Sequence, residues 1–148
     1  MKPYPAIYIG IDPGKSGGVA FIDSDGKAWA GKMPTDPYRL DLLMREVRAK
    51  GDECYAYLEA VHATPQMGVC SSFNFGKGFG ALEQCLSCLR IPYDLVSPQR
   101  WQKDMDCLTG GDKNVTKRKA QELYPELKIT HAIADALLIA TYCYRERA

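Results

Sequence analysis

The sequence predicts an α/β fold, in which a mixed five-stranded sheet flanked by helices forms a single domain. Three apolar, β-branched segments follow one another at the start of the chain, and a tight-turn signal, Asp25-Gly26, separates the second from the third. Helix-like and strand-like segments then alternate, which is typical of parallel strands joined by helices. The 148 residues fit one domain, 1–148, and a hydrophobic content of 46% is enough for its core.

Local patterns give the order of the elements. The first helix places Leu40, Met44 and Val47 on one side, and Gly51 follows its end. Thr116 is expected to cap a later helix, which stops before Pro125. We expect strands over 6–12, 18–22, 27–33, 54–59 and 93–96. We expect helices over 37–50, 79–89, 99–105, 116–124 and 131–147, and loops over 60–72 and 109–114.

Composition narrows the class of protein. The net charge is +1, so a nucleic-acid surface has to come from the arrangement of charges rather than from their sum. No apolar run approaches the ~20 residues of a membrane span, and the N-terminal segment does not resemble a signal peptide. The six cysteines lie mostly in apolar segments and are interpreted as reduced core thiols. We therefore expect a cytoplasmic protein without a membrane partner.

Acidic residues end two of the predicted strands. Asp12 ends the first strand and Glu59 the fourth, and in open α/β sheets such carboxyl ends border a ligand crevice. His131 and Asp135 are four residues apart and share one face of the last helix. This oxygen-rich set suits Mg²⁺ or Mn²⁺, and two such ions ~4 Å apart can promote hydrolysis of a phosphodiester.

Each of these residues also has a simpler explanation. Asp12-Pro13 could be a turn signal, Glu59 an exposed strand end and His131 a solvated first residue of a helix. The set of four is more specific than its members, because each falls where one shared site would need it. The Cys85-x-x-Cys88 pair has no second half, and both are interpreted as ordinary helix residues rather than as zinc ligands.

Four segments in order resemble the RuvC-type Holliday junction resolvases, including phage-type members. They are IGIDPGKSGGVAFID (9–23), LEAVHATPQMGVCSSFNFGKGFG (58–80), VSPQRWQK (96–103) with KRKAQELYP (117–125), and HAIADALLIATY (131–142). The resemblance implies an RNase H-like fold, a homodimer, and paired nicks across a four-way junction with two Mg²⁺ ions per site, which Mn²⁺ would replace. It also implies a bacterial cell as the setting, with a phage or prophage gene as an open alternative.

The resemblance also assigns roles. Asp12, Glu59 and Asp135 would be catalytic metal ligands, and His131 would take the place of the other ligand of the last motif. His131 lies four positions before Asp135, where bacterial members have three, and position 132 is Ala. Lys117 is expected near the scissile phosphate. The expected DNA contacts are Lys15, Phe73, Phe75, Lys77, Arg100, Lys103, Lys113 and Arg118, whereas Phe79 is assigned to the core.

Two other functions remain open from the residues alone. Asp12-Pro-Gly14-Lys-Ser16-Gly17 is close to the first phosphate loop of actin-like phosphotransferases, but those proteins need two such domains and 148 residues are too few. A non-catalytic module that binds branched DNA is the other alternative, against which the complete acidic set argues. Each basic residue could also belong to a solvated helix face.

Overall fold

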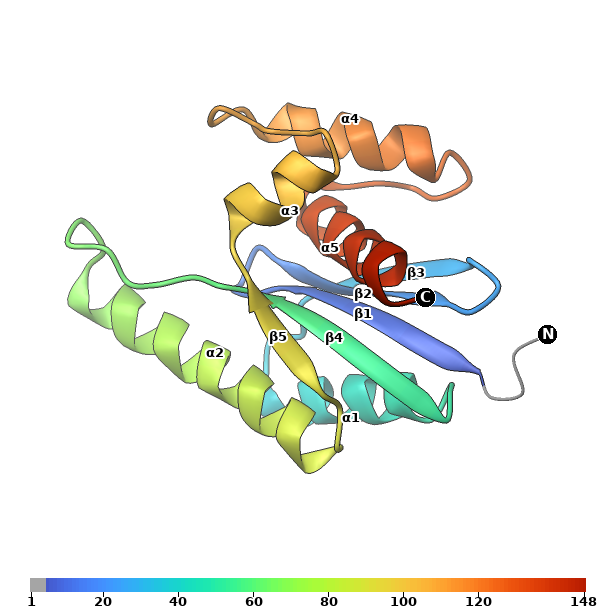
Figure 1. Ribbon diagram of the computed structural model, residues 1–148. Coiled ribbons are helices and arrows are strands. Elements are labelled where there is room, and N and C mark those ends of the chain that lie inside the picture. Colours follow the sequence, from blue (N-terminus) through green and yellow to red (C-terminus); the bar gives the residue numbers. More distant parts are fainter. Residues whose placement is uncertain (1–4) are drawn as a thin grey trace.

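The computed structural model describes residues 5–148, so residues 1–4 of the segment compared with signal peptides lie outside it. A central sheet separates two layers of helices (Figure 1). The elements in order are β1 (Ala6–Asp12), β2 (Gly18–Asp23), β3 (Ala28–Lys32), α1 (Pro37–Arg48), β4 (Glu53–Glu59), α2 (Val69–Cys88), β5 (Tyr93–Val96), α3 (Pro98–Asp104), α4 (Lys113–Leu123) and α5 (His131–Arg147).

The sheet has five strands in the order β3-β2-β1-β4-β5. β1 to β3 form an antiparallel meander, whereas β4 and β5 run parallel to β1. The expected α/β class, the mixed five-stranded sheet and its flanking helices are therefore confirmed. Because β1 and β4 are parallel neighbours, their carboxyl ends lie at the same edge of the sheet.

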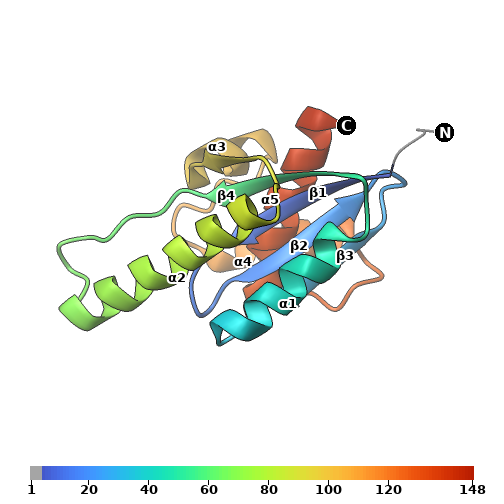
Figure 2. The same cartoon turned by 90° about the horizontal axis from the view of Figure 1, so that it is seen from below.

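Successive side chains of each strand point to opposite faces of the sheet, so the hydrophobic core has two parts. Ile7, Ile9 and Ile11 of β1 point to the side covered by α1 and α2, which Figure 2 shows from below. Tyr8 of β1 and Tyr57 of β4 point to the other side, which α3, α4 and α5 cover. Side chains two residues apart share a face of a strand, so parity decides which layer each residue meets.

Helix α5 lies directly on the sheet. A Cβ added at Gly10 would lie 2.1 Å from the Ala140 backbone nitrogen, and one at Gly18 would lie 2.7 Å from the Ala132 carbonyl oxygen. Neither position therefore has room for a side chain, and the two glycines allow the helix to approach β1 and β2. α5 is consequently buried on nearly all sides from Ala136 to Cys143, which is more than the single apolar stripe that its sequence indicates.

Helix α2 differs most from the expectation. It begins at Val69 rather than at residue 79, so the predicted loop over 60–72 is shorter and the glycine-rich segment is helical. Gly76, Gly78 and Gly80 have nothing within 4 Å of an added Cβ, so they lie on an open face of the helix. The segment is helical because Phe79, Leu82 and Leu86 form an apolar stripe that packs into the α1–α2 side of the core.

Helix α4 also begins earlier than expected. Its N-cap is Asp112, whose side chain accepts a hydrogen bond from the Asn114 backbone N–H at 2.9 Å. Thr116, expected to cap the helix, is buried inside it, and Lys113 belongs to the first turn rather than to a loop. The cap prediction at Thr116 was wrong because two cap-type residues precede the same apolar pattern, and the earlier one starts the helix.

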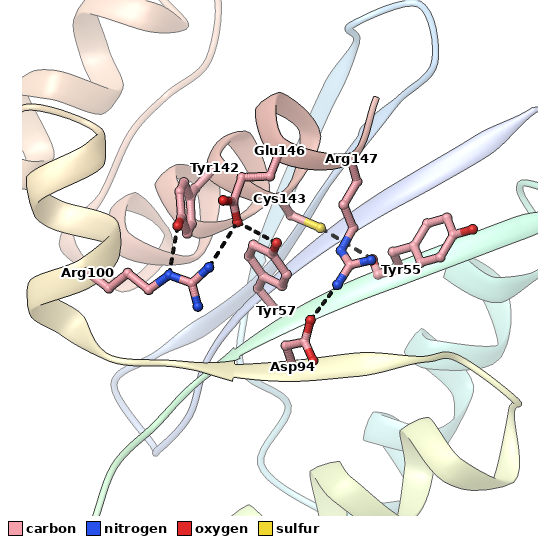
Figure 3. A network of polar contacts seen from close by, with 8 residues as sticks. All are labelled: Tyr55, Tyr57, Asp94, Arg100, Tyr142, Cys143, Glu146 and Arg147. Atoms are coloured by element: carbon pink, nitrogen blue, oxygen red, sulfur yellow. Dashed lines mark hydrogen bonds and ion pairs between the residues drawn. The ribbon is translucent and has the colours of Figure 1, made fainter.

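A polar network holds the C-terminal end of α5 against the sheet (Figure 3). The Tyr57 hydroxyl donates to Glu146 at 2.5 Å, and Arg100 donates to the Tyr142 hydroxyl at 2.9 Å. Arg147 pairs with Asp94 of β5 and lies over the rings of two β4 tyrosines. Glu146 and Arg147 at this end of the helix are therefore neutralised by partners within the protein.

Two further expectations can be compared with the structure. No helix within residues 5–148 is long and apolar enough to cross a membrane. All six cysteines are unpaired, but only Cys54, Cys107 and Cys143 are buried. The interpretation as core thiols therefore holds for half of them, and Cys70 and Cys88 are exposed on α2.

Candidate active site

Asp12 and Glu59 come together at one edge of the sheet. The register pairs Ile11 of β1 with Leu58 of β4, so the two acids occupy equivalent last positions of neighbouring parallel strands. Asp12 has the parity of Tyr8 and Glu59 that of Tyr57, so both carboxylates lie on the α5 side of the sheet. Glu59 is only 8% exposed.

The first turns of α5 bring Asp135 to the same place. α5 begins at His131, and the close contact of its first turn with Gly18 places it beside the end of β1. Asp135 is near enough to raise the pKa of both Asp12 and Glu59 by charge repulsion. His131 is exposed and lies near enough to lower the pKa of Asp135.

Burial and repulsion make these carboxyl groups hard to ionise. Desolvation, followed by repulsion from Glu59 and Asp135, raises the pKa of Asp12 from 3.8 to about 8. Desolvation likewise raises the pKa of Glu59 from 4.5 to about 7, and the pKa of Asp135 is also raised, again mainly by burial. Carboxyl groups that repel one another in a poorly solvated site need a counter-charge to be ionised together at neutral pH.

Two side chains that the sequence analysis missed contact the acids. The Trp101 indole N–H donates to Glu59 Oε2 at 2.7 Å, and both residues are buried. A hydrogen bond from the Thr116 side chain lowers the pKa of Asp135. A tryptophan in a short polar helix was an available signal, because a buried indole N–H needs an acceptor.

Lys113 is the lysine whose charge acts on the acidic group. It lowers the pKa of both Asp12 and Asp135, whereas Lys117 has no such effect on any of the three carboxyl groups within residues 5–148. Lys113 and Lys117 are one turn apart on α4 and share a face of that helix. The expected role of Lys117 near a phosphate stays a prediction, and Lys113 is the lysine whose charge lowers the pKa of Asp12 and Asp135.

The donor chemistry fits a hard divalent cation. Three carboxylates with a nearby imidazole are ligands that suit Mg²⁺ or Mn²⁺, and burial raises the pKa of all three carboxyl groups, which a bound cation would lower again. As the side chains stand, however, no three His, Cys, Asp or Glu residues in the described part of the chain are arranged to hold a metal ion. The residues therefore fit a metal ion in their ligand type and in lying at one edge of the sheet, but their side chains are not arranged around a common point.

The predicted DNA contacts of the glycine-rich segment lie on α2. The first turns of this helix project beyond the carboxyl ends of β1 and β4 (Figures 1 and 2). Phe73 is 70% exposed there, whereas Phe75 is partly buried and a Cβ at Gly14 would lie 3.4 Å from its ring. A cleft of about 480 Å³ separates α2 from the turn after β1, and Lys15 and Lys77 line it with Phe75.

The remaining basic residues are on α3 and α4. Lys103 and Arg118 are exposed. Arg100 is directed toward the C-terminal end of α5, where it bonds Tyr142 and lies 3.4 Å from Glu146. The structure therefore brings Lys113 to the acidic group and leaves Arg100 in a network of its own.

Comparisons with known proteins agree with this fold. No protein-family model and no curated protein sequence matches the chain. Among solved structures, RuvC of Thermus thermophilus matches with a TM-score of 0.64 at 17% identity, covering 95% of each chain. RuvC of the same organism in complex with a Holliday junction substrate matches with a TM-score of 0.67 at 17% identity, covering 95% of this chain and 96% of that one. The chain therefore has a RuvC-like fold of the RNase H-like class.

Proposed function

We propose that this chain is a divalent-metal-dependent endonuclease that resolves four-way DNA junctions by paired nicks. The observation that carries the proposal is the convergence of Asp12, Glu59 and Asp135 on one side of the sheet. Burial raises the pKa of all three carboxyl groups, and repulsion from Asp135 raises the pKa of Asp12 and Glu59 further. A similar fold is known in complex with a Holliday junction, which supports the choice of substrate.

Asp12, Glu59 and Asp135 would hold the cations, and His131 is a fourth candidate ligand at the start of α5. Bound divalent ions, two per site, would supply an activated water and neutralise the leaving oxygen of an in-line displacement. The three carboxylates would fix the positions of those cations at the carboxyl edge of the sheet. Lys113 would contact a phosphate oxygen beside the acids, with Lys117 one turn further along α4.

The DNA would lie across the carboxyl edge of the sheet. The projecting part of α2 offers the exposed Phe73 ring for stacking on an unpaired base near the crossover, and Lys15 and Lys77 for the adjacent backbone. Lys103 and Arg118 extend the basic surface over α3 and α4, whereas Arg100 is paired with Glu146 and is left out of this surface. Phe75 contacts Gly14 in the turn after Asp12, so we assign it to holding that turn rather than to stacking on DNA.

Paired nicks require two active sites, so we expect a homodimer. Sedimentation of the purified protein, alone and with a synthetic junction, tests this part of the proposal separately from cleavage. A monomer that cuts one strand only would leave the chemistry intact and contradict the paired nicks.

The decisive experiment is cleavage of four-way, three-way, flap and linear DNA during a titration with Mg²⁺ or Mn²⁺. We expect cutting of the four-way junction that depends on the metal and is lost in Asp12→Asn. Asp25→Asn is the matched control, because Asp25 is exposed in the turn between β2 and β3. Full cutting by Asp12→Asn would overturn the mechanism.

One observation favours the non-catalytic alternative. The side chains of residues 5–148 form no ready group of three metal ligands, as expected if the protein binds branched DNA without cutting it. The same panel decides between the two functions. Tight, metal-independent binding of the junction without cleavage in either metal would establish the binding module.

A further inference from the structure

Trp101 is the buried centre of an otherwise polar helix. Its side chain has no exposed surface, whereas Gln99, Arg100 and Lys103 on the same helix are exposed. The Trp101 indole N–H donates to Glu59 Oε2 at 2.7 Å across 42 positions of the sequence. Within residues 5–148 no other hydrogen bond reaches the Glu59 side chain. One oxygen of Glu59 is therefore held by the protein, and Oε1 is not.

Packing alone does not require this contact. A phenylalanine or a leucine would also fill an apolar site under α3, without a donor that needs a buried acceptor. An indole N–H bonded to a carboxylate is a charge-assisted hydrogen bond, which is stronger than one between neutral groups. The last torsion of a glutamate is intrinsically broad, so a fixed partner for one oxygen decides the direction of the other.

We propose that Trp101 is a positioning residue for Glu59. By holding Oε2 it leaves Oε1 as the oxygen available to a divalent cation, and it fixes the plane of the carboxylate before the cation arrives. This inference rests on the proposed function, because it assumes that Glu59 is a metal ligand. It also implies that α3, which carries the predicted DNA contacts Arg100 and Lys103, sets the orientation of a ligand in the active site.

The first test measures Mn²⁺ binding directly, from the loss of the electron paramagnetic resonance signal of free Mn²⁺. We expect Trp101→Phe to bind Mn²⁺ about 10- to 100-fold more weakly, which is the usual cost of removing a group that orients a metal ligand. Trp29→Phe is the matched control, since Trp29, the other tryptophan of the chain, lies on β3 and stacks on Phe21 instead. Mn²⁺ affinity of Trp101→Phe within about twofold of the control overturns the proposal.

A second variant separates the hydrogen bond from packing. In the Trp29→Phe background, Trp101 is the only tryptophan left and can be replaced globally by benzothienylalanine, in which sulfur stands in place of the indole N–H. The ring keeps its shape and loses only the donor. We expect this protein to stay folded, to unfold at a somewhat lower denaturant concentration than its parent because Glu59 Oε2 loses a buried donor, and to show the same weakened Mn²⁺ binding. Unchanged Mn²⁺ binding overturns the proposal, even if Trp101→Phe fails to fold.

Failure of the proposed function is distinguishable from failure of this inference. A protein that binds Mn²⁺ in a Glu59- and Trp101-dependent way but cuts no junction contradicts the nuclease and supports the role of Trp101. A protein that cuts junctions and binds Mn²⁺ equally well without the indole N–H supports the nuclease and overturns the role of Trp101. Absence of Mn²⁺ binding in the unaltered protein overturns both.

Discussion

The two ends of α5 lie against the same sheet but differ in how the charged side chains around them are paired. At the C-terminal end, Arg147 pairs with Asp94, and Glu146 accepts from Tyr57 (Figure 3). At the N-terminal end, Asp135 adds a third acid to Asp12 and Glu59, and burial raises the pKa of all three. Glu146 and Arg147 are neutralised by partners at the first end, whereas three acids are crowded together at the second.

This difference separates a stabilising role from a functional one. Paired charges at the C-terminal end contribute to holding the helix on β4 and β5, and they are neutralised without a ligand. Crowded acids at the N-terminal end destabilise the protein when they ionise, and such an arrangement is typical of a site that binds a cation. Proteins accept this cost at functional sites, so removing the acids should improve stability while it abolishes activity.

The largest effect is expected on cleavage at the acidic end. Asp12→Asn keeps the shape of the side chain and removes the negative charge, so we expect the rate of junction cutting to fall by more than about 100-fold, beyond the usual cost of disturbing a group that only orients a ligand. Single-turnover cleavage of a four-way junction in Mg²⁺ measures the rate. An equal loss in the Asp25→Asn control would show that the effect is not local.

The close packing of α5 on the sheet, on which both of its ends depend, can be disrupted at Gly10. A Cβ at this position would lie 2.1 Å from the Ala140 nitrogen and 2.3 Å from the Ala136 oxygen, so Gly10→Ala has to displace α5. We expect a loss of about 3 kcal/mol in the free energy of unfolding, measured by urea denaturation. Gly76→Ala is the matched control, because nothing lies near its Cβ and alanine favours a helix by up to about 1 kcal/mol. A stable Gly10→Ala protein would contradict the close approach.

The pH dependence of stability sharpens the comparison. In the folded protein the pKa of Asp12 is raised from 3.8 to about 8, so the stability that goes with the protonated form is present below about pH 4 and is lost as the pH rises through 8. With EDTA present at about pH 9, we expect Asp12→Asn to be more stable than the unaltered protein by on the order of 2 kcal/mol. The gap should close toward about pH 4. If Asp12→Asn were less stable than the unaltered protein at the higher pH, the inferred repulsion and burial of Asp12 would be wrong.

The smallest effect is expected at the neutralised end. Glu146→Gln weakens the bond from Tyr57 and the ion pair with Arg100, and Glu146 is partly exposed, so we expect a loss of about 1 kcal/mol in the free energy of unfolding. Urea denaturation at neutral pH measures it, with Glu122→Gln on the exposed side of α4 as the control. A gain in stability would place Glu146 with the crowded acids.

Much of the sheet could be predicted because short-range rules act within each strand. Alternation along β1 assigns Ile9 to one layer and Tyr8 to the other, and the same parity places Asp12 and Glu59 on one side once the two strands are neighbours. The start of α2 could not be read in the same way. Gly76, Gly78 and Gly80 have a low helix propensity, and only the packing of Phe79 and Leu82 against the rest of the core outweighs it.

By itself the sequence determined where the strands and the last helix lie along the chain and which acids end β1 and β4, because hydrophobic periodicity is a local property. Only the tertiary structure decided that Trp101 bonds Glu59, that Lys113 rather than Lys117 acts on the acids, and that Gly10 admits α5. Each of these contacts joins segments far apart in the chain. Their distances depend on how helices pack on the sheet, and no local pattern contains that information.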